Sequence, residues 1–245
     1  MKSVLITGAN RSIGLETVKQ LSKKGLFVYL GSRDLEKGNA VTDELKKNGY
    51  ENIKAIEIDV TNSNSILAAK KVIESEQGKL DILINNAGIL GTNPQQASST
   101  PIDNIREVFD TNFFGVINVT QVFLELLKKS VSPRISNITS GLASLTLHNN
   151  PDWKYYGIKT AGYGTSKAAL NAYTIALAHE LKDLPFKVNV IDPGYTATDF
   201  NHHSGPLTVE SAASFIVKHT LTDENAPTGK FFSNDIEDET EESPW

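Results

Sequence analysis

Tyr163 and Lys167 have the residue types and the spacing needed for proton transfer. Residues i and i+4 share one face of a helix, so a helix here would hold the ammonium group beside the phenol. A free phenol has a pKa of about 10. A neighbouring ammonium favours the phenolate and lowers that pKa toward neutrality, which suits a residue that gives up and regains a proton. The pair therefore predicts an acid–base site.

A glycine-rich turn near the start of the chain indicates a second kind of chemistry, the binding of an anion. An apolar segment ends at Thr7 and is followed by Gly8-Ala9-Asn10-Arg11-Ser12-Ile13-Gly14, where a helical pattern begins. Backbone N–H groups point outward at such a strand-to-helix turn, and the helix dipole attracts an anion. Glycine is needed where the chain turns sharply and where a phosphate approaches the backbone. The turn predicts a phosphate-binding site.

The order of these motifs resembles the short-chain dehydrogenase/reductase family. The family's T-G-x-x-x-G-x-G loop corresponds to residues 7–14, except that Ser12 stands where the family has its middle glycine. N-N-A-G corresponds to residues 85–88, Y-x-x-x-K to residues 163–167, and P-G-x-x-x-T to residues 193–198. The resemblance covers essentially the whole chain and implies a single Rossmann-type domain that binds a nicotinamide dinucleotide.

The resemblance also implies which residues contact the cofactor. Asp59 and Val60 would contact the adenine, and Asn86 would lie beside the adenosine ribose. The backbone of Thr196 and the hydroxyl of Thr198 would hold the nicotinamide carboxamide. The predicted cofactor-binding set is Gly8, Asn10, Arg11, Ser12, Ile13, Gly14, Arg33, Asp59, Val60, Asn86, Ala87, Gly88, Tyr163, Lys167, Pro193, Gly194, Thr196 and Thr198.

A serine and an asparagine complete the implied catalytic group. Ser140 matches the family's catalytic serine, which hydrogen-bonds the substrate carbonyl oxygen; Thr139 and Ser136 are competing hydroxyls. Ser140 is preferred because it lies just past a predicted strand, where open α/β sheets bind ligands. In the family, the residue corresponding to Asn112 holds a water that continues the proton path from the lysine. The predicted catalytic set is Asn112, Ser140, Tyr163 and Lys167.

The choice between NAD and NADP is expected to depend on the end of the second predicted strand. Enzymes that select NAD usually place a carboxylate there, but this chain has Ser32 followed by Arg33. Arg11 adds a second cation, and arginine binds phosphate in bidentate fashion. We therefore predict NADP(H), with its 2′-phosphate bound by the arginines. The alternatives are that Arg33 only pairs with Asp34 or Glu36, or that a one-residue shift brings Asp34 to the ribose.

Strand and helix patterns alternate along the chain, which predicts a parallel sheet covered by helices on both faces. The predicted strands are residues 3–7, 27–31, 53–59, 82–85, 134–139, 187–192 and 230–232; the predicted helices are residues 13–24, 35–48, 63–76, 102–129, 164–184 and 208–220. No linker or repeat interrupts this alternation. We predict one α/β domain over residues 1–245, a doubly wound Rossmann-type sheet of about seven strands. The acidic segment 235–242, part of a tail over residues 235–245, is expected to be solvated.

The composition argues against several other classes of function. The net charge is −5 over 245 residues, whereas a nucleic-acid-binding protein needs a basic face. There are no cysteines, and the five histidines lack a metal-ligand spacing, so no metal is predicted. No apolar run approaches the ~20 residues of a membrane span, and the N-terminal run is too short for a signal peptide. We expect a cytoplasmic protein without a membrane partner, and leave monomer and homo-oligomer equally open.

Three segments are expected to bound the substrate: residues 91–100, 143–159 and 199–205. The middle segment lengthens the gap between Ser140 and Tyr163, where monomeric carbonyl reductases also carry an insertion. Within it, Trp153 and Tyr155 are candidates either for pocket walls or for packing the insertion against the body of the domain.

The predicted function is reversible, NADPH-dependent reduction of a ketone or aldehyde to an alcohol. The resemblance implies transfer of the pro-S hydride, with Tyr163 donating the proton. One alternative is an NAD-linked alcohol dehydrogenase. The other is a non-catalytic NADP-sensing regulator, whose mark would be a broken Tyr–Lys–Ser set; here all three residues are present.

Overall fold

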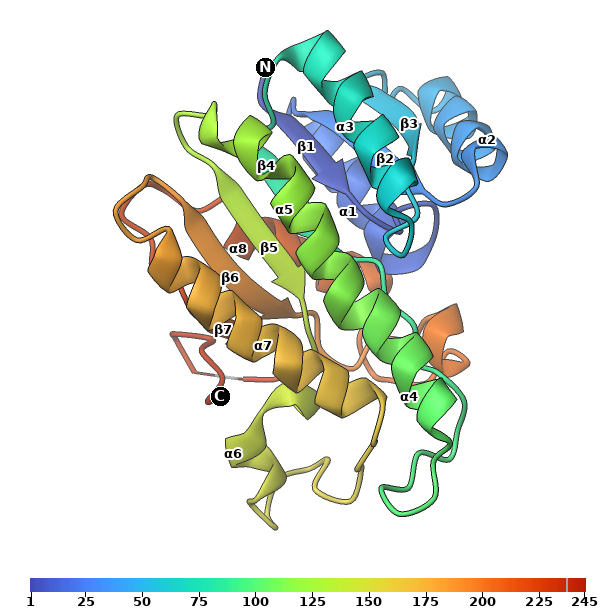
Figure 1. Cartoon of the computed structure of the whole chain (residues 1–245), viewed down its shortest axis with the longest axis vertical. Helices are drawn as coiled ribbons and strands as arrows, with labels where there is room; N and C mark the ends of the chain where they lie inside the picture. The colour runs from blue at the N-terminus through green and yellow to red at the C-terminus, as the bar shows by residue number, and fades with distance from the viewer. Residues whose placement is uncertain (237) are drawn as a thin grey trace.

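A seven-stranded parallel sheet runs through the centre of the molecule in a computed structural model that describes residues 1–236 and 238–245 (Figure 1). The strands are β1 (Ser3–Ile6), β2 (Phe27–Ser32), β3 (Ile53–Glu57), β4 (Ile82–Asn85), β5 (Arg134–Ile138), β6 (Lys187–Asp192) and β7 (Phe231–Ser233). Their order is β3-β2-β1-β4-β5-β6-β7. The order reverses between β1 and β4, which opens a crevice at the carboxyl ends of these strands.

Helices cover both faces of this sheet. The helices α1 (Ser12–Lys23), α2 (Leu35–Lys47) and α8 (Val209–Thr220) lie on one face, and α3 (Ser63–Gln77), α5 (Gly115–Lys128) and α7 (Tyr163–Glu180) lie on the other (Figure 1). The helix α4 (Ile102–Phe109) precedes α5, and the short α6 (Leu145–His148) precedes α7. Within the two described ranges, no helix has the length and apolar character needed to cross a membrane.

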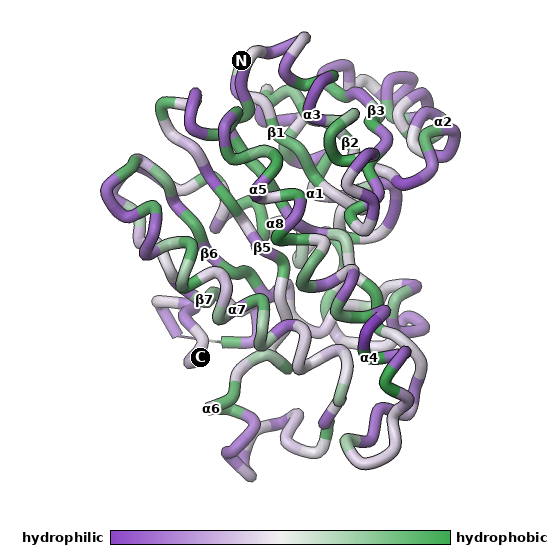
Figure 2. The backbone as a smooth tube through the Cα atoms, in the orientation of Figure 1, coloured by the Kyte–Doolittle hydropathy of each residue, from purple (hydrophilic) through white to green (hydrophobic). Residues whose placement is uncertain are grey.

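Alternating directions of apolar side chains explain why the sheet is covered twice. In β1, Leu5 packs in the cluster under α5 and α7, while Val4 and Ile6 pack in the cluster under α1 and α8. In β4, Leu83 belongs to the first cluster, and Ile82 and Ile84 to the second. Both faces of β1 and β4 are therefore buried, and Figure 2 shows hydrophobic residues along β1. The predicted doubly wound fold is confirmed.

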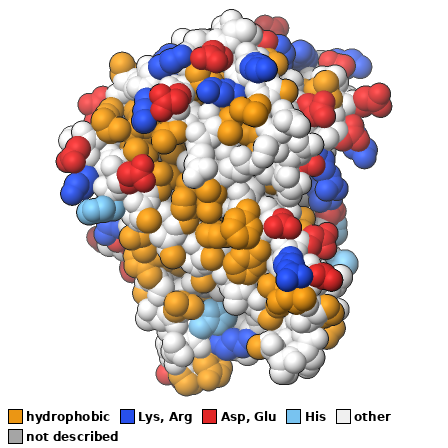
Figure 3. Space-filling view, in the orientation of Figure 1, with side chains coloured by type: hydrophobic (Ala, Val, Ile, Leu, Met, Phe, Trp, Pro, Cys, Tyr) orange, Lys and Arg blue, Asp and Glu red, His pale blue; other side chains and the backbone are white. Residues whose placement is uncertain are grey.

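Hydrophobic side chains also remain on the outer surface of one helical layer. Figure 3 shows them gathered on the face that α4, α5 and α7 present to the viewer. Phe114 is 55% exposed and Ile175 is 44% exposed. The solvent face of this layer is therefore partly apolar.

The predicted helix over residues 102–129 contains a π-helical segment that the sequence pattern did not reveal. This segment, η1 (Asp110–Phe114), separates α4 from α5. A Cβ on Gly115 would lie 2.8 Å from Cγ2 of Val60, so glycine allows the widened turn to approach the loop after β3. Such π segments often occur at functional sites, and Asn112 lies within this one.

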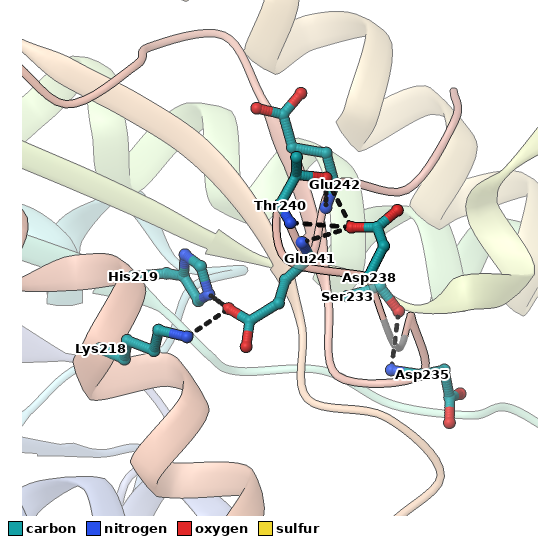
Figure 4. A network of polar contacts seen from close by, with 8 residues as sticks. All are labelled: Lys218, His219, Ser233, Asp235, Asp238, Thr240, Glu241 and Glu242. Carbon is teal, nitrogen blue, oxygen red and sulfur yellow. Dashed lines mark hydrogen bonds and ion pairs between the residues drawn. The ribbon is translucent and has the colours of Figure 1, made fainter.

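The acidic chain end packs against the domain instead of extending into solvent. Residues 238–240 are exposed, but Oε2 of Glu241 accepts hydrogen bonds from Nζ of Lys218 at 2.6 Å and from Nε2 of His219 at 2.7 Å (Figure 4). Nζ of Lys230 binds the carboxylate of Glu242 at 2.8 Å. The expectation of a solvated segment is wrong for these two glutamates, because α8 and the residue before β7 supply cationic and imidazole partners.

The same segment forms backbone bonds with the last strand. The N–H of Ser233 donates to the carbonyl of Glu241 at 2.9 Å, and the N–H of Ser243 donates to the carbonyl of Phe231 at 2.7 Å. Trp245 then packs on Phe231, with ring centroids 5.6 Å apart. The chain therefore runs back antiparallel along β7.

Candidate active site

A single cavity of about 1120 Å³ lies at the carboxyl ends of the strands and collects nearly all the residues predicted from the sequence. The predicted residues that line it are Gly8, Asn10, Arg11, Ser12, Ile13, Gly14, Arg33, Asp59, Val60, Asn86, Ala87, Gly88, Ser140, Tyr163, Lys167, Pro193, Gly194, Thr196 and Thr198. Asn112 is fully buried behind the wall. Motifs from seven parts of the sequence thus meet in one place.

Close backbone contacts explain the two remaining glycines of the first turn. Gly8 has φ +61°, and a Cβ there would lie 2.9 Å from Cα of Ala87. A Cβ on Gly14 would lie 2.6 Å from Nδ2 of Asn86. Asn86 in turn donates from Nδ2 to the carbonyls of Thr7 and Gly8, at 2.9 and 3.0 Å. The side chain of Asn86 therefore braces the turn from the neighbouring strand.

Ser12 occupies a backbone conformation that favours glycine. Its φ is +48°, in the left-handed region, where a side chain costs energy. Ser12 is the first residue of α1, and the preceding Arg11 provides no side-chain cap. The first N–H groups of α1 therefore face the cavity wall without a capping side chain from Arg11, which fits an anion.

Cations surround the end of β2. Ser32 is buried, and its hydroxyl donates to the carbonyl of Asp34 at 2.8 Å. Asp34 caps α2 by accepting from the N–H of Lys37 at 3.0 Å, and it also pairs with the Lys37 ammonium at 3.1 Å. Arg11 and Arg33 are exposed at the cavity and form no ion pair within the described ranges. The alternative that Arg33 pairs with Asp34 or Glu36 is not what the structure contains.

The wall near the third strand is built around Asp59. Its Oδ1 accepts hydrogen bonds from both the N–H and the hydroxyl of Thr61, at 2.9 and 2.8 Å. The N–H of Asp59 donates to Oγ of Ser65 at 2.9 Å. These bonds hold the backbone of Asp59 and Val60 at the cavity surface.

Tyr163 and Lys167 lie on one face of α7, as their spacing predicted. Nζ of Lys167 is 6.0 Å from the ring centroid of Tyr163, and it donates to the carbonyl of Ile138 at 2.7 Å. Lys167 is only 4% exposed. A Cβ on Gly88 would lie 3.7 Å from Nζ, so this glycine leaves the ammonium accessible to the cavity.

Burial is the main influence of the chain's own groups on the ionisation of this pair. Burial raises the pKa of Tyr163 above its ordinary value, and the Asp192 carboxylate adds to that effect, while the Ser140 side chain acts in the opposite direction. Burial lowers the pKa of Lys167 to about 8, against the influence of Asp192. The lowering of the Tyr163 pKa that we expect from Lys167 together with an oxidised nicotinamide stays a prediction; among the chain's own groups, desolvation and Asp192 raise this pKa.

Asp192 is a functional candidate that the motifs missed. It ends β6, is 3% exposed, and lines the same cavity as Tyr163. Oδ1 accepts from the N–H of Gly194 at 3.0 Å, and Oδ2 accepts from the hydroxyl of Ser233 at 2.6 Å. Burial raises the pKa of Asp192 to about 6, although these hydrogen bonds lower it. An acid directly before Pro193 and Gly194 was the available sequence signal.

The three competing hydroxyls in and directly after β5 differ in their surroundings. The hydroxyl of Thr139 donates to Oδ1 of Asn171 at 2.7 Å, and Ser136 shares a hydrogen bond of 2.8 Å with Thr220. Both side chains are thus engaged inside the core. Ser140 lines the cavity, and its Oγ accepts from the N–H of Leu142 at 3.2 Å, which leaves its proton free to donate.

Asn112 connects the loop after β4 with α7. Its Oδ1 accepts from the N–H of Ile89 at 2.8 Å, and its Nδ2 donates to the carbonyl of Ile89 at 2.9 Å and to Oγ of Ser166 at 3.2 Å. A Cβ on Gly88 would approach its Oδ1 to 3.3 Å. The π segment therefore delivers this side chain to the back of the cavity.

The turn after β6 supplies the opposite wall. Gly194 has φ +78°, and a Cβ there would lie 2.5 Å from Cδ1 of Leu207. Thr196 donates from its hydroxyl to the carbonyl of Gly194 at 3.1 Å. Thr198 caps the 3₁₀ helix η3 (Asp199–Asn201) in a reciprocal capping arrangement with Asn201. These bonds fix a turn that faces the cavity.

The insertion over residues 143–159 contributes one of its two aromatic candidates directly. Tyr155 lines the cavity, and its ring packs edge-on against Tyr195 with centroids 5.9 Å apart. Trp153 packs behind Tyr155 at 5.4 Å and against His148 at 5.1 Å. Tyr155 is thus positioned as a wall residue of the cavity, and Trp153 supports it from behind.

Comparisons with known proteins agree with this geometry. Residues 2–206 match the family model described as short chain dehydrogenase. Salutaridine reductase of Papaver bracteatum is 31% identical, covering 95% of this chain and 94% of the relative. (−)-Isopiperitenone reductase of Mentha piperita is 32% identical, covering 94% of this chain and 96% of the relative.

Solved structures give the same result. Salutaridine reductase from Papaver somniferum superimposes with a TM-score of 0.83 at 30% identity, covering 96% of this chain and all of the other. An NADPH-bound carbonyl reductase from chicken fatty liver superimposes with a TM-score of 0.82 at 26% identity, covering 95% and 96%. The family match over residues 2–206, the similarity to the relatives and the shared fold lead to one conclusion: this chain belongs to the short-chain dehydrogenase/reductase family.

Proposed function

We propose that this protein is an NADPH-dependent carbonyl reductase that reduces a small ketone or aldehyde to an alcohol. The observation that carries the proposal is the meeting of Tyr163, Lys167 and Ser140 with the glycine turn in one cavity. Relatives named as reductases, and a solved structure named as an NADPH-bound carbonyl reductase, support the reaction class.

The cavity fits a dinucleotide. A Cβ at Gly8 or Gly14 would collide with neighbouring backbone or side-chain atoms, so both positions need glycine. The first N–H groups of α1 receive no cap from the Arg11 side chain and are therefore available to a phosphate. Arg11, Arg33 and Lys37 line the cavity near Ser32, where an NAD enzyme would place an acid. Asp34 is engaged as the cap of α2. This charge arrangement favours the 2′-phosphate of NADP.

The chain's own groups can manage the proton and the orientation of the substrate. A bound reduced nicotinamide would supply the hydride. Tyr163 remains protonated at neutral pH because burial and Asp192 raise its pKa, so it can donate its proton to the developing alkoxide. Ser140 can donate to the same oxygen. Lys167 is held by the carbonyl of Ile138 and places positive charge beside Tyr163 while the tyrosine loses and regains its proton.

The cofactor preference is tested by changing the charge at the end of β2. Arg33→Glu is expected to lower kcat/KM for NADPH by at least about tenfold, equivalent to about 1.4 kcal/mol, because it replaces a phosphate donor with a repelling charge. Lys24→Glu makes the same charge change on an exposed residue outside the cavity and should leave the ratio of NADPH to NADH unchanged. If the parent enzyme prefers NADH, the protein is instead an NAD-linked dehydrogenase.

The proton donor is tested by removing a single hydroxyl. Tyr163→Phe is expected to lower turnover by about 10²–10⁴-fold while NADPH still binds, because the ring remains and only the acid is lost. Tyr156→Phe is the matched control, since Tyr156 is 41% exposed and lies outside the cavity. NADPH oxidation should be followed with aldehydes, aryl ketones, quinones and keto esters. Binding without turnover on every carbonyl would favour the regulatory alternative.

A further inference from the structure

The first turn of α7 takes its cap from a distant residue. The residue before the helix is Gly162, which has no side chain to accept from the first N–H groups. Oε1 of Gln95 accepts from the N–H of Gly162 at 3.0 Å and from the N–H of Tyr163 at 2.8 Å. One amide oxygen thus satisfies two donors, one of which belongs to the tyrosine itself.

Gln95 also holds the opposite wall of the cavity. Its Nε2 donates to the carbonyl of Leu90 at 2.6 Å, and its own carbonyl accepts from the N–H of Ala161 at 3.1 Å. Leu90 and Tyr163 both line the cavity. Gln95 therefore joins the loop after β4 to the start of α7 by three hydrogen bonds, and a fourth, to Leu90, holds it within that loop.

The surroundings leave this amide little freedom. Gln95 is 4% exposed. Cβ atoms added at Gly162 and Gly91 would lie 3.1 Å from its Oε1 and 3.4 Å from its Nε2, so both glycines make room for it. A buried polar group that loses its partner costs about 1–3 kcal/mol, which opposes other rotamers of this side chain.

Gln95 and Asn112 form similar arrangements near the start of α7, because each ties a residue of the loop after β4 to this helix. Asn112 binds Ile89 and Ser166, and Gln95 binds Leu90 and the backbone of Tyr163. Two consecutive residues of one loop, Ile89 and Leu90, are thereby tied to the start of the helix that carries Tyr163. A misplacement of about 1 Å can lower an enzymatic rate by about 10²-fold, so such ties matter for the rate.

We propose that Gln95 is a positioning residue that sets the place of the Tyr163 hydroxyl relative to the substrate. It acts through the backbone of Tyr163 and through Leu90. The proposal rests on the reductase function, and it adds that order in the loop over residues 91–100 is required for proton transfer.

The test replaces the amide with a thioether of similar size. Gln95→Met is expected to lower kcat by about 10–100-fold, with NADPH affinity unchanged, because the tyrosine is displaced while the glycine turn is untouched. The solvent deuterium isotope effect on kcat should rise as proton transfer becomes slower. Gln121→Met is the matched control, because Gln121 is an exposed glutamine on α5 and lies outside the cavity. A loss of folded protein would lower kcat without changing the isotope effect, and that result would overturn the proposal.

Two further measurements keep the test decisive. If Gln95→Met does not fold, Gln95→Asn, one methylene shorter, is expected to show the same loss of kcat and the same rise in isotope effect. Amide exchange at Gly162 and Tyr163 should accelerate in either variant, and this readout needs no turnover. A parent enzyme that fails to reduce carbonyls would refute the proposed function alone, whereas unchanged exchange and unchanged kcat in both variants would refute the role of Gln95.

Discussion

Asp192 places a carboxylate in the cavity that holds Tyr163, and it sets the direction of a pH effect. Oxidation of an alcohol needs the phenolate, so its rate rises with pH through the pKa of Tyr163. Burial raises that pKa and the Asp192 carboxylate raises it further. Asp192→Asn removes the negative charge, so the rising limb of the oxidation profile should move to lower pH.

The control for this prediction is Asp235→Asn. Asp235 raises the pKa of Asp192 but is not among the groups that shift Tyr163. Above the pKa of Asp192, about 6, the Asp235 variant should therefore keep the parent profile. The measurement is kcat for alcohol oxidation across the alkaline range at saturating NADP⁺. An unchanged or alkaline-shifted limb in Asp192→Asn would contradict the assigned electrostatic role.

Ser12 offers a second test at single-residue scale. Its φ of +48° costs an L-residue about 1–2 kcal/mol, whereas glycine adopts it freely but loses up to about 1 kcal/mol in unfolded-state entropy. Ser12→Gly is therefore expected to raise the free energy of unfolding by up to about 1 kcal/mol, and to change NADPH affinity by less than about tenfold. Ser12→Ala keeps the Cβ and should give no such gain in denaturant unfolding. A less stable glycine variant would show that the hydroxyl has a structural role.

The motifs predicted which residues meet, because the cofactor motifs and Ser140 follow strands, and parallel strands end at one edge of the sheet. They did not predict the ionisation of Tyr163, which depends on burial and on Asp192, a residue at the end of β6, whereas Tyr163 begins α7. Gln95 was missed for a similar reason. Its sequence neighbours form no periodic pattern, and its importance comes from an interaction with Tyr163 that only the folded chain creates.

At the scale of elements, the two aromatic residues of the insertion have different roles: Tyr155 forms part of the cavity wall, and Trp153 packs behind it. Tyr155 lines the cavity, so Tyr155→Ala should change the ratio of kcat/KM between bulky and small ketones. Trp153 makes two edge-on ring contacts, each worth about 0.5–1.5 kcal/mol, so Trp153→Ala should lower thermal stability and reduce activity on all ketones alike. Equal effects of the two variants on the substrate ratio would contradict this division.

Regular elements were predicted well, and irregular ones were not. Buried runs such as β1 and β4 gave strands of the right position, because both of their faces carry apolar residues. The π segment η1 was missed, since its sequence continues the helical pattern of α4 and α5. The short α6 was missed because four residues provide too little periodicity.

At the scale of the whole molecule, Glu241 attaches the end of the chain to α8. Burial opposes its ionisation, but Lys218 and His219 outweigh this effect and hold the pKa of Glu241 below its usual range. A carboxyl with a lowered pKa contributes stability that is present above its unfolded pKa and is lost as the pH falls through the folded value. Glu241→Gln should therefore lower the unfolding free energy by about 1 kcal/mol at neutral pH, or about 2–4 °C in Tm.

Thermal unfolding at several pH values measures this contribution. The difference in Tm between the parent and Glu241→Gln should shrink in acid, where the parent carboxyl is protonated too. Glu239→Gln is the control, because Glu239 is exposed. A Tm difference that persists unchanged in acid would show that the ion pairs do not carry the effect.

The return of residues 241–243 along β7 also governs how one molecule meets another. A strand with free backbone groups at the rim of a sheet can recruit a strand from a second chain, which leads to domain swapping or fibres. Here the N–H of Ser233 and the carbonyl of Phe231 are already paired within the molecule. An incoming strand must first displace this segment, so self-association at β7 requires local opening of the chain end. Resistance to aggregation on this side is therefore set by how firmly the last residues hold, independently of the stability of the core.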